Sequence, residues 1–146
     1  MVDKWAGELF KCGYNCAQSV FAAHAAKFGI DTDTALKLSA PLGGGVGRMR
    51  EVCGAFSACA MLLGLKKASS EPSAERKKEI YELTQKLAEE FKRENGSIIC
   101  RDILNLQKDA PTPPTPDART AEYYAKRPCL RVVESADALA RKFLAQ

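Results

Sequence analysis

The sequence contains few of the features that mark the common functional classes. It has a single histidine, His24, with no acidic residue close to it in the sequence, which argues against a cysteine–histidine catalytic pair. No two cysteines have the Cys-x-x-Cys spacing of zinc ribbons and thioredoxin-like proteins. The longest uncharged apolar stretch, Val52 to Leu65, is shorter than the roughly 20 residues that a bilayer requires. It therefore predicts a buried helix and no membrane insertion.

A strong charge of one sign and a leader segment are also lacking. The net charge is +4, and basic residues alternate with acidic ones, as in residues 75–79. This pattern gives no indication of a nucleic-acid partner. Residues 1–10 carry two acids and no apolar core of the kind found in signal peptides. We therefore expect a cytoplasmic protein.

What the chain does have is sulfur. Six cysteines among 146 residues are too few for a disulfide scaffold. In the reducing cytoplasm, several cysteines indicate metal binding or redox chemistry more often than structural bridges. The six are Cys12, Cys16, Cys53, Cys59, Cys100 and Cys129.

Helical periodicity runs through most of the chain, and the alternation typical of strands is nearly absent. The pattern predicts an all-α fold, a single helical domain over residues 1–146. It would be a bundle of five or six helices around a central apolar helix at about 51–66, with a Pro-rich surface loop at 108–118. The predicted helices are a short N-terminal one that breaks near Gly13, then about 15–27, 35–39, 51–66, 73–94, a short one within 97–104, 120–126 and 129–144.

Three of the cysteines, Cys53, Cys100 and Cys129, lie at or near predicted helix starts, and Cys16 follows the predicted break near Gly13. The first turn of a helix has unpaired N–H groups and a positive potential, and both stabilise a thiolate. Cys59 lies among small apolar residues, which predicts a core position.

A glycine-rich run, residues 42–47, precedes Cys53. It lacks the Gly-Lys-Ser/Thr of a phosphate-binding loop and the Gly-x-Gly-x-x-Gly register of a dinucleotide site. We expect a tight turn that lets the backbone approach Cys53 or a bound group. Arg48 and Arg50 can hold a small anion there. The candidate cofactor-binding residues are Gly44, Gly45, Gly47 and Arg48.

These features occur together in one known family. The relevant segments are Asn15-Cys16-Ala17-Gln18, Gly43 to Met49, Glu51-Val52-Cys53-Gly54-Ala55, Cys100 to Leu104, and Cys129. With them the chain resembles the C_GCAxxG_C_C family, which is described as redox-active. It departs from the family motif at Ala58, where the motif has its second glycine. The resemblance implies that Cys16, Cys53, Cys100 and Cys129 are the four characteristic cysteines, with a redox or metal role.

Three functions remain open on the sequence. In the first, these four cysteines form a metal site that holds an iron–sulfur cluster or zinc. In the second, the protein carries out thiol–disulfide exchange, with Cys53 as the reactive thiol and Cys16 or Cys100 as the resolving thiol. In the third, the cysteines only pack, and the chain is a helical binding module whose apolar faces support a homodimer. The first two imply an electron-transfer or thiol partner.

Overall fold

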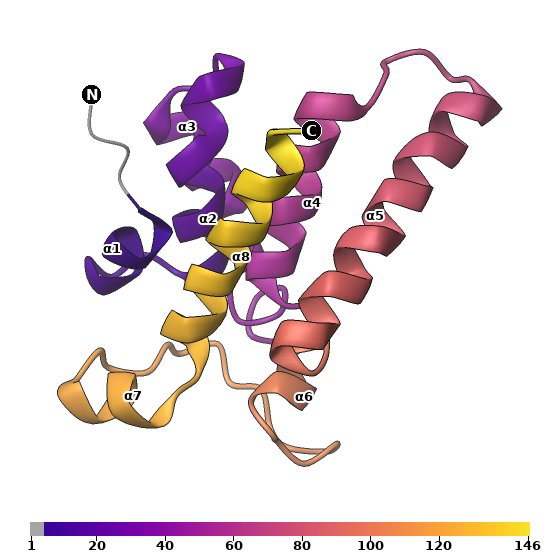
Figure 1. Ribbon diagram of the computed structural model, residues 1–146. Coiled ribbons are helices and arrows are strands. Elements are labelled where there is room, and N and C mark those ends of the chain that lie inside the picture. Colours follow the sequence, from indigo (N-terminus) through magenta and orange to yellow (C-terminus); the bar gives the residue numbers. More distant parts are fainter. Residues whose placement is uncertain (1–4) are drawn as a thin grey trace.

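The computed structural model describes residues 5–146, and the fold of this part is entirely helical (Figure 1). It contains eight α-helices, two short 3-10 turns and no strand beyond an isolated bridge between Val52 and Ile99. The all-α prediction is confirmed. The count exceeds five or six because three helices have only four to six residues. The helices are α1 (Ala6–Lys11), α2 (Cys16–Ala25), α3 (Thr32–Ser39), α4 (Gly54–Lys67), α5 (Ala74–Asn95), α6 (Cys100–Ile103), α7 (Ala121–Lys126) and α8 (Cys129–Leu144).

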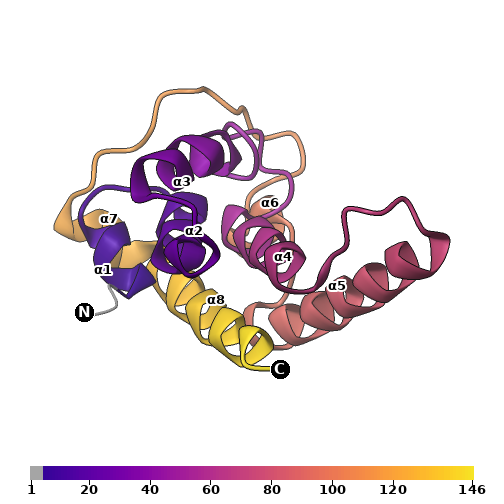
Figure 2. The same cartoon turned by 90° about the horizontal axis from the view of Figure 1, so that it is seen from above.

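Helices α2, α4 and α8 pack against one another, α3 lies on α2, and the long α5 lies along α4 and α8 (Figure 2). Their shared core consists of apolar side chains that are almost completely buried. Helices α5 and α8 contribute an apolar stripe at helical spacing, whereas α4 is apolar over most of its surface. Among the largest are Val20, Leu62, Leu87, Phe91 and Val133.

Helix α4 contributes small residues to this core. Ala55, Ala58 and Cys59 are buried, and their size allows neighbouring helices to approach closely. The Cys59 thiol donates to the carbonyl of Ala136 in α8, at 3.2 Å, so Cys59 is the core residue that its neighbours in the sequence predicted. No helix within residues 5–146 combines the length and hydrophobicity needed to cross a bilayer.

Local sequence signals set most helix ends. Asn15 caps α2 in a capping box with Gln18, so that each side chain accepts from the other residue's backbone N–H. Ser73 caps α5 with a single hydrogen bond, which its side chain accepts from the backbone N–H of Arg76. Gly29 and Gly96 end helical segments with positive φ angles of 80° and 87°, which a glycine adopts without strain.

His24 is part of a buried polar cluster between two helices. Its ring is fully buried between α2 and α8, with Nε2 2.5 Å from Oδ1 of Asp137. Lys27 Nζ lies 3.3 Å from Nδ1, and because an ammonium only donates, Nδ1 accepts and Nε2 carries the proton toward Asp137. Asp137 also accepts from the backbone N–H of Ala6, at 3.2 Å. The acid that pairs with His24 is 113 residues away in the sequence, so local inspection could not find it.

Candidate functional site

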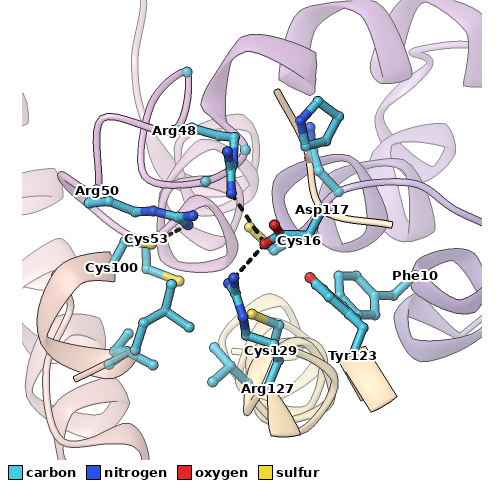
Figure 3. A pocket seen from close by; sticks show the side chains of 18 of the residues that line it. Phe10, Cys16, Arg48, Arg50, Cys53, Cys100, Asp117, Tyr123, Arg127 and Cys129 are labelled. Atoms are coloured by element: carbon cyan, nitrogen blue, oxygen red, sulfur yellow. Dashed lines mark hydrogen bonds and ion pairs between the residues drawn. The ribbon is translucent and has the colours of Figure 1, made fainter. Parts of the chain in front are cut away.

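The four cysteines predicted to act together all line one cavity of about 380 Å³ (Figure 3). It lies where several helix starts meet. Cys16, Cys100 and Cys129 are the first residues of α2, α6 and α8, and Cys53 is the N-cap of α4. The starts of these four helices therefore border a shared space.

Backbone pairing brings Cys53 and Cys100 together although they are 47 positions apart. Cys53 N–H donates to the carbonyl of Ile98, and Cys100 N–H donates to the carbonyl of Glu51, both at 2.7 Å. These bonds flank the antiparallel bridge between Val52 and Ile99. The pairing holds the start of α6 beside the start of α4.

The glycine-rich loop forms an unusual left-handed turn. Residues 44 to 48 all have positive φ angles, between 58° and 72°, and Arg50 has a φ of 61°. Backbone hydrogen bonds hold the turn: Gly47 N–H donates to Pro41 at 2.8 Å, and Glu51 N–H donates to Gly45 at 2.8 Å. Only glycine adopts this conformation readily, and Val46, Arg48 and Arg50 are held in it by the surrounding structure.

Two glycines of this loop allow a direct test of the close approach to Cys100. A Cβ at Gly45 would lie 2.6 Å from Cys100 Cβ, whereas a Cβ at Gly47 would meet no atom within 4 Å. Both residues have positive φ. We expect Gly47→Ala to lower the free energy of unfolding by about 1–2 kcal/mol through backbone strain alone. Gly45→Ala should cost a further 1–3 kcal/mol or so from overpacking.

Urea denaturation of the two variants measures the difference between them. Equal losses for Gly45→Ala and Gly47→Ala would contradict the close packing of the loop against Cys100.

Cys16 and Cys53 lie close together, and each perturbs the pKa of the other thiol. The pKa of Cys16 is lowered from 9.0 to about 6, chiefly because the Cys53 thiol donates to it. Burial raises this pKa, and the backbone N–H groups of Gly44, Ala17 and Ala55 lower it further. The pKa of Cys53 is raised, because it keeps the shared proton, is buried and faces the charge on Cys16. These opposite directions favour ionisation of Cys16 before Cys53, and the prediction of Cys53 as the reactive thiol stays a prediction.

Glycine after Cys53 makes this close approach possible. A Cβ at Gly54 would lie 2.8 Å from Cys16 Sγ and 2.6 Å from the Leu42 carbonyl oxygen. Real Cβ atoms do not approach this closely, so α4 could not start here with any larger residue. This close packing explains why glycine follows Cys53 in the motif.

Cys100 and Cys129 complete the sulfur group. Burial raises the pKa of both thiols. Arg50 Nη1 donates to Cys100 Sγ at 3.7 Å and partly offsets that rise. A negative charge on Cys16 raises both pKa values further, so the four sulfurs are near enough to sense one another's charge.

Arginines dominate the polar lining of the cavity, and two of them tie the Pro-rich segment across it. Arg48 donates to the carbonyl of Pro113, at 2.7 Å, and to Asp117. Arg127 also binds Asp117 from the start of α8, and Figure 3 shows this carboxylate between the two guanidinium groups. Arg119 donates to the carbonyls of Phe10 and Tyr14, at 2.8 and 3.0 Å. The segment around 113–119 thus forms one wall of the cavity.

The predicted site residues are mostly found here. Gly44, Gly47 and Arg48 line the cavity with the four cysteines, and Gly45 packs directly behind Cys100. Cys12 is exposed and is not among the lining residues. Asp117, Arg119, Tyr123 and Arg127 were missed. Only Arg127 had a local signal, because it precedes the Pro128-Cys129 helix start.

A single metal ion does not fit the cysteines as they lie. Within residues 5–146, no group of three or more His, Cys, Asp or Glu side chains could hold a metal ion. A tetrahedral zinc site needs sulfurs roughly 4 Å apart, since each Zn–S bond is about 2.3 Å. The zinc prediction therefore has no support from the arrangement of these residues.

Comparison with known proteins agrees with the position of the four cysteines. Residues 14–143 match the model of the family described as "Putative redox-active protein (C_GCAxxG_C_C)". No curated protein and no solved structure matches the chain. The match spans nearly the whole chain and all four cavity cysteines, and the chain belongs to the C_GCAxxG_C_C family.

Proposed function

We propose that this protein is a thiol–disulfide redox protein whose reacting pair is Cys16 and Cys53. The observation that carries the proposal is that Cys16 Sγ lies against Gly54, the residue after Cys53, and that both cysteines line a cavity large enough for a small molecule. A thiolate is the attacking form in disulfide exchange, and Cys16 has its negative charge stabilised by a neighbouring thiol and by helix N–H groups.

The chemistry needs only these two residues and a substrate disulfide. The Cys16 thiolate attacks one sulfur of the substrate, forms a mixed disulfide and releases the first thiolate. Cys53 then gives up its proton and attacks Cys16 Sγ, which forms the Cys16–Cys53 disulfide and releases the second thiolate. Two electrons pass from the protein to the substrate, and both leaving thiolates take up protons.

The low pKa of Cys16 also suits it as the leaving group when an excess of small thiol reverses the reaction. Cys53, which keeps its proton longer, suits the resolving step, because it becomes a strong nucleophile once deprotonated.

Thiol counting tests the proposal directly. The reduced chain has six free cysteines. After anaerobic treatment with a small disulfide and removal of the reagent, we expect four titratable thiols and a mass lower by two hydrogen atoms. Retention of all six thiols would contradict the proposal.

A second candidate, an iron–sulfur centre, is favoured by a different observation: all four family cysteines, not two, converge on the cavity. The donor set suits it, because four thiolates are the usual ligands of such clusters, and helix N–H groups hydrogen-bond to ligand sulfurs. Cys16, Cys53, Cys100 and Cys129 would hold it, and the arginines of the cavity would offset their negative charge. Such a cluster supplies one-electron transfer.

Iron and acid-labile sulfide in anaerobically purified protein separate the two candidates. The dithiol proposal expects neither in stoichiometric amount. Stoichiometric iron and sulfide, with visible absorbance that is lost in Cys129→Ser, would replace it with the cluster. Cys129 is the informative position, because the dithiol reaction does not use it.

A further inference from the structure

Among the arginines that line the cavity, Arg50 alone has neither a carboxylate nor a carbonyl as its hydrogen-bond acceptor. Arg50 is nine-tenths buried at the end of the left-handed turn, and its side-chain hydrogen bond goes to a thiol, Cys100 Sγ, at 3.7 Å. None of the ion pairs found among residues 5–146 includes it. A guanidinium withdrawn from water without an anion is costly, so such a group is normally paired.

The other arginines of the cavity are already engaged. Arg48 and Arg127 share Asp117, and Arg119 binds backbone carbonyls and lies over the ring of Phe10, 4.1 Å from its centre. Four arginines therefore face a single carboxylate in the lining, which contains no lysine or glutamate. Even with a thiolate on Cys16, the cavity keeps an excess of positive charge, and Arg50 is its free donor.

The size and the remaining walls of the cavity restrict what the anion belongs to. About 380 Å³ lies in the range of small-molecule sites, which is too small for a folded partner. The rest of the lining is largely apolar and includes Phe10, Ile103 and Val132. A small molecule with an uncharged middle and a charged end satisfies both surfaces.

We infer that the oxidant of this protein is a small disulfide with carboxylate groups, and that Arg50 binds one of these carboxylates while Cys16 attacks the sulfur. This inference rests on the proposed dithiol function. Arg50 is thus a specificity residue. It selects among disulfides by charge and takes no part in the exchange, whose electrons and protons are those of the Cys16–Cys53 reaction.

Three disulfides of different charge test it. The probes are oxidised glutathione (anionic), 2-hydroxyethyl disulfide (neutral) and cystamine (cationic). The measurement is the second-order rate constant for formation of the Cys16–Cys53 disulfide, by acid quench and mass spectrometry. For the wild-type protein we expect the anionic probe to react at least about 10-fold faster than the cationic one, since a charge-assisted hydrogen bond contributes that much or more.

The variant Arg50→Gln should slow the anionic probe by about 10-fold and change the neutral probe by less than about twofold. Arg50→Lys, which keeps the charge, should recover part of the loss. Arg76→Gln on α5 is the matched control: its side chain is exposed, and it removes the same net charge far from the cavity. It should leave all three rates unchanged, which separates a local contact from general attraction to a positive protein.

The results of these experiments distinguish a failure of the dithiol function from a failure of the role of Arg50. If no probe oxidises the Cys16–Cys53 pair, the dithiol function fails. If the neutral probe reacts but the anionic one has no advantage, or keeps it in Arg50→Gln, only the role of Arg50 fails. An equal decrease in the rate constants of all three probes in Arg50→Gln would mean that this arginine supports the structure and does not bind the substrate.

Discussion

Replacing Cys16 by serine is expected to remove the reactive thiol of this protein. At pH 6, a thiol with a pKa of about 6 is half ionised, which is about 500-fold more thiolate than at the ordinary pKa of 9.0. The lower pKa weakens the nucleophile by about 20-fold, so the net advantage in disulfide exchange is about 20-fold. Reaction with a dipyridyl disulfide at pH 6 should therefore show one fast thiol, absent in Cys16→Ser.

The pH dependence follows from the same pKa. The rate of the fast thiol should rise up to about pH 6 and then level off, because Cys16 is already ionised above that value. The control is Cys12→Ser, since Cys12 is exposed and does not line the cavity. Loss of the fast phase in Cys12→Ser, or its persistence in Cys16→Ser, would show that the low pKa has been assigned to the wrong residue.

The change Asp137→Asn is expected to destabilise the fold by about 3–5 kcal/mol, the usual cost of removing one charged partner from a buried pair. Asp137 is 3% exposed and accepts from His24 and from the N–H of Ala6, with Arg141 Nε 3.5 Å away. An asparagine keeps the volume but loses the charge, and its amide hydrogens would face one of these donors. Urea denaturation measures the loss.

A matched control is Asp33→Asn, at an exposed ion pair with Lys37 in α3, which should cost less than about 1 kcal/mol. Acid denaturation adds a second check. Burial raises the pKa of Asp137, but His24, the Ala6 N–H and Arg141 together lower it below 3.8. Its stabilisation is therefore present above that pH and is lost as the pH falls through the lower value, so Asp137→Asn should show a shallower acid limb. Equal costs for Asp33→Asn and Asp137→Asn would contradict the buried pair.

The helices were predictable because their signals are local. Cys129 to Leu144 was expected as the last helix and is α8, and the long helix expected from 73 to 94 is α5 at Ala74–Asn95. Caps, apolar stripes and terminal glycines act within a few residues, so one segment suffices to read them. The placement of Cys16, Cys53, Cys100 and Cys129 near helix starts followed from these ends.

The site itself was only partly predictable, because its geometry depends on contacts between distant segments. Nothing in residues 48–50 indicates that two arginines will adopt positive φ, since only the packing of the whole turn makes that conformation favourable. Asp117 lies in a Pro-rich segment that reads as a surface loop, yet it joins Arg48 and Arg127. Likewise, the opposite pKa shifts of Cys16 and Cys53 arise from an interaction between segments that are distant in the sequence.

Peptide mapping of the oxidised protein identifies which two cysteines form the disulfide. Fully reduced, metal-free protein is oxidised with 2-hydroxyethyl disulfide, alkylated, digested and examined by mass spectrometry. Our account predicts one intramolecular disulfide between Cys16 and Cys53, with Cys12, Cys59, Cys100 and Cys129 recovered alkylated. A disulfide between any other two cysteines, or full recovery of Cys16 and Cys53 as alkylated thiols, would contradict it.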